Sequence, residues 1–378
     1  ATSHHIDAQE SATDSDRDIV DMSAVDVALL LKQRKIFPTE LAEIAIRRIE
    51  TVQPMINAVV QFPKAKVLHE ARLATERIAK GEVDWTTQPL TGVPITIKDS
   101  LDVRGMPTTS GVPKFLGEIA IKDATVVRRL RRAGAIIIGK TNLPALLSAY
   151  ETDNPVFGRT NNPYDVRCTS GGSSGGEAAI IASGGSWLGV GSDGLGSIRV
   201  PGHYCGIPGL RPGWGRVSRA GHKPGPPGAE GGLPDPGLLT VGPFARSVAD
   251  LHVALSIMQG PDPLDPNTFP SPLRDYCQTA QQLRGLKVAV WSESEGAVLT
   301  AETANILEEA AKTLEKLGID VTDDKPPLAD EIYDISQALY SPFFVNEWED
   351  VLKEHGIEVP GPVDRDMIEG LADWAKPY

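Results

Sequence analysis

The chain has 378 residues, of which 41% are hydrophobic (Ala, Val, Ile, Leu, Met, Phe, Trp, Tyr or Cys) and 23% are charged. This balance is typical of a globular protein with a large core. It excludes a fibrous chain, a disulfide-stapled mini-protein and a mainly disordered chain. The formal net charge of -13 repels phosphate backbones and anionic lipid surfaces, so we expect no nucleic-acid partner.

The cysteines and the apolar runs bear on where the protein works. Cys168, Cys205 and Cys277 are few and widely spaced, which is typical of neither a disulfide framework nor a zinc site. This pattern fits a reducing compartment, and the first residues contain no apolar signal segment, so we expect a cytoplasmic protein. No apolar run approaches the roughly 18 residues that a membrane span needs.

The first part of the chain predicts a leader and then helices. Residues 1–22 are polar and acidic, and we expect a flexible leader there. Ser23, with Asp26 three residues later, is typical of a helix cap. Two further amphipathic helices are predicted, one from Pro38 to about Val52 and one from about Ala65 to Lys80.

Strands then alternate with helices, which predicts an α/β fold. The apolar run 94–98 is typical of a strand, and residues 123–133 are typical of a helix that Gly134 ends. A short apolar strand is predicted over 135–138. The same pattern returns later, with a strand over 286–291, a helix over 301–317 and a strand over 319–322.

Two stretches are rich in glycine or proline. Between residues 168 and 215, 15 of 48 residues are Gly, which indicates that the backbone itself approaches a ligand or turns sharply. Between residues 221 and 243, 13 of 23 residues are Gly or Pro, and we expect a long surface loop there.

The glycine-rich stretch matches two known motifs whose required surroundings are missing. Residues 189–194 have the GxGxxG spacing of a dinucleotide site, but Pro201 and later prolines interrupt the helix that must follow. Residues 171–175 match the Gly-x-Ser-x-Gly nucleophile elbow, which must follow a buried strand, whereas residues 161–170 are polar and turn-like. In this alternative, the partners of the serine would come from Asp193, Asp235, His203, His222 and His252.

Lys98 is the strongest candidate for a general base. It ends the apolar strand 94–98, where loss of water disfavours the charged form and lowers the pKa of a lysine from about 10.4. A neutral lysine can take a proton from a serine. The alternative is a surface lysine that pairs with Asp99.

Three segments together resemble the amidase signature family. They are residues 92–99 (GVPITIKD), 171–179 (GGSSGGEAA) and 191–201 (GSDGLGSIRVP). Their order and spacing match as well, with 75 residues from Lys98 to Ser173 and 24 from Ser173 to Ser197. Weaker similarity at 154–163 and 242–247 extends the resemblance over most of residues 23–325.

This resemblance implies a Ser-cisSer-Lys triad. By motif, Ser197 is the nucleophile, Ser173 follows a cis peptide bond and bridges, and Lys98 is the base. The backbone N–H groups of the residues up to Ser197 would form the oxyanion hole: Gly194, Leu195, Gly196 and Ser197 itself. Supporting roles fall to Ser174, Ser192, Asp193 and Arg199, and substrate binding to Leu147 and Ser148.

The family's fold is implied too, as one large α/β domain over 23–378 with a mixed, twisted sheet flanked by helices. The sequence departs from the family at two places. Leu195 stands where the family usually has Gly, which places a side chain beside the acyl pocket. The C-terminal part, up to Tyr378, is short relative to the family.

The function that follows from the resemblance is a serine hydrolase that cleaves C–N bonds of amides through an acyl-enzyme. Carbamates (urethanes) and aryl esters present the same carbonyl chemistry. Two alternatives remain: the A-type subunit of a glutamine-dependent amidotransferase, and a non-catalytic scaffold of the same fold. We expect a small-molecule amide, carbamate or ester substrate, no metal and no cofactor, and a homodimer is compatible with the sequence.

Overall fold

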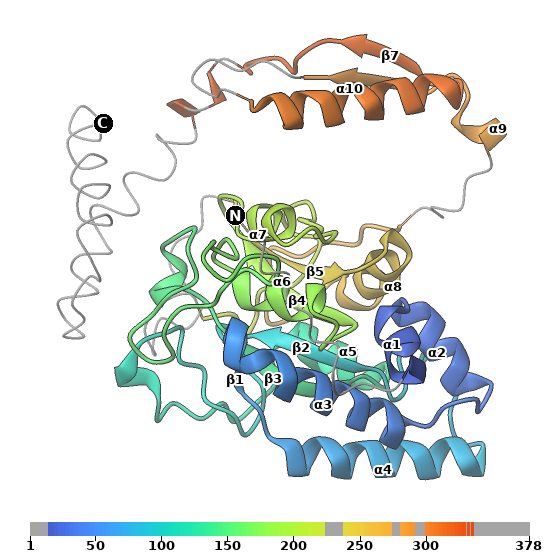
Figure 1. The fold of residues 1–378 in the computed structure, drawn as a ribbon, viewed down its shortest axis with the longest axis vertical. Helices are drawn as coiled ribbons and strands as arrows, with labels where there is room; N and C mark the ends of the chain where they lie inside the picture. Colours follow the sequence, from blue (N-terminus) through green and yellow to red (C-terminus); the bar gives the residue numbers. More distant parts are fainter. Residues whose placement is uncertain are drawn as a thin grey trace. The chain divides into compact units, whose positions relative to one another are not determined.

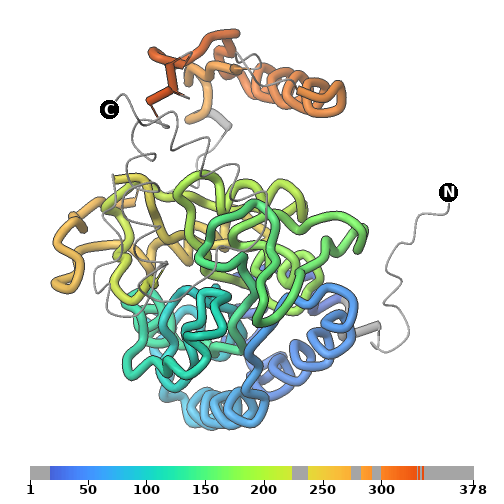
Figure 2. Tube along the Cα trace, turned by 90° about the vertical axis from the view of Figure 1, so that its left-hand side faces the viewer, coloured from blue at the N-terminus to red at the C-terminus, as the bar shows by residue number. Residues whose placement is uncertain are grey.

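The computed structural model describes residues 14–223, 237–273, 280–291, 299–329, 331–332 and 334–335. Among these described residues, those up to Ser271 belong to one compact unit and those from Pro272 onward to a second. Figures 1 and 2 follow the chain through both, and each is described by itself. One domain over 23–378 stays a prediction.

The first unit is built on a five-stranded sheet with the order β1-β3-β2-β4-β5. Its strands are β1 (Val59–Gln61), β2 (Pro94–Lys98), β3 (Ile136–Thr141), β4 (Leu188–Asp193) and β5 (Thr240–Ala245). Strand β2 runs parallel to β3 and β4, whereas β1 and β5 are antiparallel to their neighbours at the two edges. The predicted mixed α/β sheet is confirmed.

Helices surround this sheet (Figure 1). They are α1 (Asp14–Asp21), α2 (Ala24–Lys32), α3 (Pro38–Ile56), α4 (Lys64–Lys80), α5 (Thr125–Arg132), α6 (Gly175–Ala182), α7 (Arg199–Tyr204) and α8 (Val248–Met258). Helices α3 and α4 pack side by side, α6 packs on β2, β4 and β5, and α5 contacts α8 (Figures 1 and 2).

The N-terminal elements largely follow the sequence pattern. Ser23 caps α2 by accepting the N–H of Asp26 at 3.0 Å, as predicted. Helix α3 continues four residues beyond Val52, through Pro54. Helix α1 lies within the range 1–22 for which the sequence predicts a leader, and residues 1–13 lie outside the described residues.

The central strands hold the core, because every residue of β2, β3, β4 and β5 is buried. Burial on both faces is typical of strands inside a helix-covered sheet. The prediction of a surface loop over 221–243 is wrong for its last residues, since Thr240–Pro243 belong to β5. Backbone pairing with β4 along the whole strand outweighs the weak strand propensity of Gly and Pro. Residues 224–236 of that range lie outside the described residues.

The second unit contains a parallel pair of strands and a long helix. Strand β6 (Lys287–Val290) pairs with β7 (Asp320–Asp323), and α10 (Ala301–Lys316) connects them. Thr300 caps α10 by accepting the N–H of Thr303 at 3.2 Å. A short helix, α9 (Ala280–Leu283), precedes β6. The strand, helix and strand predicted over 286–322 are therefore present.

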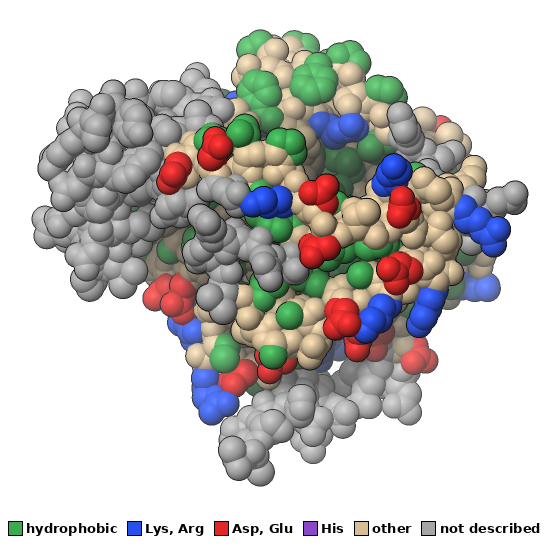
Figure 3. All heavy atoms as spheres, turned by 90° about the horizontal axis from the view of Figure 1, so that it is seen from above, with side chains coloured by type: hydrophobic (Ala, Val, Ile, Leu, Met, Phe, Trp, Pro, Cys, Tyr) green, Lys and Arg blue, Asp and Glu red, His purple; other side chains and the backbone are tan. Residues whose placement is uncertain are grey.

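Two surface properties can be stated for the described residues. None of their helices is both long enough and apolar enough to cross a membrane. On the face drawn in Figure 3, acidic and basic side chains are mixed with one another, and a group of exposed hydrophobic side chains lies at the top of the view.

Candidate active site

Lys98 lies at the carboxyl end of β2 and is completely buried. Its Nζ donates hydrogen bonds to Ser173 Oγ at 2.7 Å and to Ser192 Oγ at 3.1 Å. Burial lowers the pKa of Lys98 to about 7, although the negative charges of Asp193 and Glu177 act in the opposite direction. A substantial fraction of this lysine is therefore neutral near pH 7.

Asp99, the next residue, does not pair with Lys98. Its Oδ1 lies 3.2 Å from Lys140 Nζ, and both side chains are buried. The Asp99 carboxylate also accepts from Gln61 Nε2 at 2.5 Å and from Thr109 Oγ1 at 2.5 Å. The alternative of a surface Lys98 paired with Asp99 is wrong, because a second buried lysine on the adjacent strand takes that carboxylate.

Ser173 follows a cis peptide bond, Gly172–Ser173, as the family resemblance implies. Thr152 holds the turn on both sides of this serine, because its Oγ1 donates to Gly171 O at 2.8 Å and accepts the Gly175 N–H at 3.1 Å. Ser173 and the neighbouring Ser174 are both buried. The sequence gives no signal for Thr152, which is more than twenty residues away.

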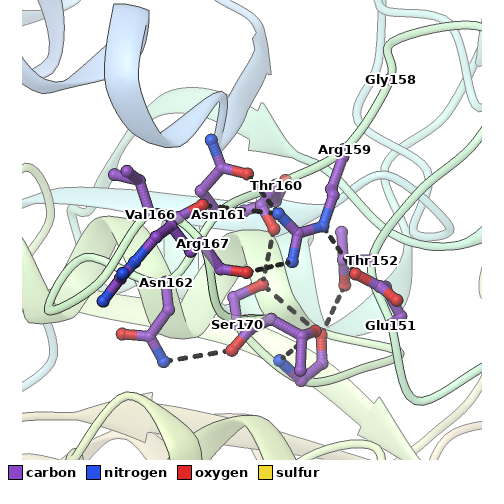
Figure 4. Close-up of polar contacts among 12 residues, drawn as sticks. Glu151, Thr152, Gly158, Arg159, Thr160, Asn161, Asn162, Val166, Arg167 and Ser170 are labelled. Atoms are coloured by element: carbon purple, nitrogen blue, oxygen red, sulfur yellow. Dashed lines mark hydrogen bonds and ion pairs between the residues drawn. The ribbon is translucent and has the colours of Figure 1, made fainter.

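Figure 4 shows how polar contacts organise the segment before Ser173. Arg159 lies at its centre and donates to Glu151 Oε1 at 2.6 Å and to Asn161 Oδ1 at 2.9 Å (Figure 4). Ser170 Oγ donates to Thr160 O at 3.3 Å. These contacts fix an irregular segment that has no strand or helix of its own over 162–172. The nucleophile-elbow interpretation requires a strand at that place, so it is wrong.

Ser197 lies in the turn between β4 and α7. Its carbonyl accepts the N–H of Ser174 at 3.2 Å, so its backbone lies against the residue that follows Ser173. Because β2 and β4 run parallel, their carboxyl ends meet at the same edge of the sheet. The structure therefore brings Lys98, Ser173 and the turn that carries Ser197 to one edge.

The two supporting serines connect these pieces. Ser192 Oγ accepts from Lys98, and Ser174 Oγ donates to the Ser192 carbonyl at 3.3 Å. Both side chains are buried. Their contacts tie the end of β4 to the start of α6, the two elements that flank the site.

Asp193 organises the turn after β4. Its Oδ1 accepts the Gly196 N–H at 2.8 Å, and its Oδ2 accepts the N–H groups of Ile198 at 3.0 Å and Arg199 at 3.2 Å. The Arg199 guanidinium binds the same carboxylate at 3.0 and 2.9 Å, and Arg211 Nε lies 3.5 Å from it. Burial alone would raise the pKa of Asp193, but these contacts hold it below its ordinary value.

The predicted oxyanion donors differ in what they contact. The Gly196 N–H is already used by Asp193, so the prediction that it is free for an oxyanion is not met. Within the described residues, the N–H groups of Gly194, Leu195 and Ser197 have no acceptor. Gly196 itself has a φ of +119°, which L side chains rarely adopt, and a Cβ there would lie 3.1 Å from Val200 Cγ2.

The predicted substrate-binding residues lie in the turn Ala145–Leu147 and just after it. Leu146 and Leu147 both have left-handed backbones, with φ of 53° and 63°. Such conformations cost about 1–3 kcal/mol each and are frequent at functional sites. Ser148 Oγ donates to Ala145 O at 2.8 Å, so its hydroxyl serves this turn. Binding of substrate by Leu147 and Ser148 stays a prediction.

Glu177 is a buried acid for which the sequence assigned no role. Thr96 Oγ1 and Thr141 Oγ1 donate to its carboxyl group at 2.6 and 2.9 Å. Burial raises the pKa of Glu177 to about 8, so near neutral pH it is mainly protonated. In that state it adds little negative charge beside Lys98. Its position in the first turn of α6, in an apolar run directly after the serines, is the signal that could have identified it.

His222 is one of the histidines that a Ser-His-Asp arrangement could use. It is buried, and burial together with the charges of Lys98 and Arg219 lowers its pKa to about 3. Among the described residues, neither of its ring nitrogens has a hydrogen-bond partner. An imidazole with so low a pKa and no hydrogen-bond partner among the described residues is a weak base, so His222 is a poor candidate for the general base.

The sequence profile of the Amidase family matches residues 40–361, most of the chain. The chain belongs to the amidase signature family. It is 35% identical over 340 residues to the acylamidase of Rhodococcus erythropolis, covering 87% of this chain and 66% of that protein. It is 37% identical over 298 residues to the A-type subunit of the glutamyl-tRNA(Gln) amidotransferase of Carboxydothermus hydrogenoformans, covering 79% and 59%.

A solved structure agrees with this assignment. The native peptide amidase from Stenotrophomonas maltophilia superimposes with a TM-score of 0.75 at 27% identity, over 94% of this chain and 72% of that one. The chain spans about two thirds or less of the length of the two curated relatives named above. Membership of the amidase signature family was predicted from three short segments and is confirmed.

Proposed function

We propose that this amidase-family chain hydrolyses the C–N bond of amides, with Ser197 as nucleophile. The observation that carries the proposal is the completely buried Lys98, 2.7 Å from Ser173 and with a pKa of about 7. A lysine that is partly neutral near pH 7 can act as a general base without a histidine.

The reaction begins with two linked proton transfers. Neutral Lys98 accepts the proton of Ser173 Oγ, and Ser173 Oγ accepts the proton of Ser197 Oγ. The Ser197 oxygen then forms a bond to the amide carbonyl carbon, and the carbonyl π electrons move to its oxygen. The N–H groups of Gly194, Leu195 and Ser197, which have no acceptor among the described residues, are the donors available to that oxyanion. One such donor contributes about 3–4 kcal/mol.

The tetrahedral intermediate collapses when the C–N bond breaks. The proton on Lys98 returns through Ser173 to the leaving nitrogen, so an amine departs and an acyl group stays on Ser197. Water then attacks the acyl carbon and gives one proton through Ser173 to Lys98. The bond between Ser197 Oγ and the acyl carbon breaks, Ser197 Oγ takes that proton back through the relay, and a carboxylic acid is released. The relay ends in its starting state, with neutral Lys98.

The substrate is proposed to be a small linear amide, since the chain resembles an acylamidase and a peptide amidase. Carbamates and aryl esters are proposed as further substrates, because the same attack on the carbonyl serves them. A cytoplasmic location and a homodimer remain predictions from the sequence.

The test is hydrolysis of a panel of p-nitroanilides, primary amides, aryl carbamates and p-nitrophenyl esters, with Ser197→Ala as the control. We expect anilide or amide turnover that the control lacks. Turnover of esters alone would contradict the proposal of an amidase, and equal turnover by Ser197→Ala would contradict the assignment of the nucleophile.

A second candidate is favoured by the 37% identity to the A-type subunit of an amidotransferase. A chain with that role would release ammonia from glutamine and pass it to a partner protein. Ammonia release from glutamine at a rate above that from anilides and other amides would favour this candidate over the acylamidase activity.

A further inference from the structure

Tyr150 connects the two turns that carry the serines of the proposed triad. Its Oη donates to the carbonyl oxygen of Leu195 at 2.6 Å, across 45 residues of sequence. Leu195 lies in the turn after β4, two residues before Ser197. The tyrosine side chain is about half exposed, so the core does not require it.

The backbone of Tyr150 lies against the other turn. A Cβ at Gly172 would come within 2.9 Å of the Tyr150 carbonyl carbon and 3.0 Å of its Cα. Only a residue without a side chain allows this approach. The backbone of Tyr150 therefore packs closely against Gly172, the residue that precedes Ser173, while its hydroxyl binds the turn that precedes Ser197.

The contact at Leu195 has a specific geometric consequence. The Leu195 carbonyl and the Gly196 N–H belong to one planar peptide unit, here called the 195–196 peptide, and point in opposite directions. Tyr150 binds the carbonyl at 2.6 Å, and Asp193 binds the N–H at 2.8 Å. The 195–196 peptide is thus held at both ends, which fixes the orientation of its plane.

The orientation of the 195–196 peptide determines the direction of the N–H groups beside it. These are the N–H groups of Leu195 and Ser197, which have no acceptor among the described residues. The hydroxyl of Tyr150 keeps its proton, because burial and the negative charge of Asp193 raise its pKa above the ordinary value. It therefore remains a donor to the carbonyl at any working pH.

We propose that Tyr150 is a positioning residue that, together with Asp193, orients the oxyanion donors next to the 195–196 peptide. The inference rests on the proposed amidase function. Without the hydroxyl, the 195–196 peptide is held only on its N–H side and can rotate. The donors then lose alignment with the developing oxyanion but not with the ground-state substrate, so kcat should fall while KM stays nearly constant.

The test compares Tyr150→Phe with Tyr164→Phe in the full chain. Tyr164 is a matched control, since it is 59% exposed and its hydroxyl has no partner among the described residues. We expect Tyr150→Phe to lower kcat about tenfold or more with KM within about twofold. Its affinity for a peptide-aldehyde inhibitor, whose adduct carries an oxyanion, should fall by a similar factor. Tyr164→Phe should behave as the wild type in both measurements.

Several results would overturn the inference. One is wild-type kcat in Tyr150→Phe, and another is a change in KM alone, which would make Tyr150 a wall of the substrate pocket. A fall in melting temperature that matches the loss of kcat would indicate a structural role. A loss of kcat in Tyr150→Leu with no loss in Tyr150→Phe would assign the effect to the ring. These outcomes leave the proposed function intact, whereas a wild-type chain with no amidase activity would overturn both.

Discussion

The protonation of Lys98 should control how fast the serine is acylated. Its pKa lies at about 7 rather than the ordinary 10.5, which corresponds to roughly 5 kcal/mol against the charged form. At pH 7 about half of Lys98 is neutral, compared with about one in 3,000 for an ordinary lysine. Burial therefore increases the fraction of active base by about three orders of magnitude.

The sign of the pH effect follows from which form is active. Neutral Lys98 is the base, so the acylation rate should fall about tenfold per pH unit below pH 6 and level off above pH 8. The assay is the second-order rate of reaction with a fluorophosphonate, followed by intact mass from pH 5 to 9. Circular dichroism at each pH verifies that the chain remains folded.

The buried acid Glu177 supplies a matched control for this profile. With a pKa of about 8, it is mainly protonated below that pH, so Glu177→Gln should leave the rate near pH 7 almost unchanged. Above pH 8 the ionised Glu177 side chain of the wild type raises the pKa of Lys98. Glu177→Gln has no such charge, so its rate should follow the titration of Lys98 alone. A rate in Glu177→Gln that keeps rising through pH 9, or a wild-type rate that does not change between pH 5 and pH 9, would refute the reasoning.

Further predictions concern the proton relay and the buried ion pair between Lys140 and Asp99. Lys98→Ala and Ser197→Ala should abolish amide turnover. Ser173→Ala should retain a small fraction of the wild-type turnover, because a water molecule can replace a relay hydroxyl. Wild-type-like turnover in Lys98→Ala or Ser197→Ala would exclude that residue from the chemistry. Lys140→Met leaves Asp99 buried without its cation and should lower the free energy of unfolding by about 3–5 kcal/mol in urea titrations. The double variant with Asp99→Asn should recover part of that loss, and an unchanged single variant would contradict the pairing.

A local pattern predicted the strand that positions Lys98. The apolar run before Lys98 forms β2 at the predicted residues. Motif order then indicated that Lys98 and Ser173 meet. These features depend on residues that are neighbours in the sequence or on a known motif, so they can be predicted from the sequence alone.

Contacts between distant segments could not be predicted in the same way. Strand β4 contains Gly, and β5 contains Gly and Pro, which have weak strand propensity, so local sequence does not indicate these strands. They form because they pair with each other in the buried sheet. The partner of Asp99 is Lys140, which comes close only because β2 and β3 lie side by side. Tyr150 likewise reaches Leu195 only in the folded chain.

The central claim is that Ser197 is a nucleophile activated by Lys98 through Ser173. Peptide mapping after fluorophosphonate treatment at pH 8 tests it most directly. We predict one adduct, on Ser197, that is absent in Ser197→Ala and strongly reduced in Lys98→Ala. An adduct on Ser173 or Ser174 instead, or an undiminished adduct on Ser197 in Lys98→Ala, would contradict it.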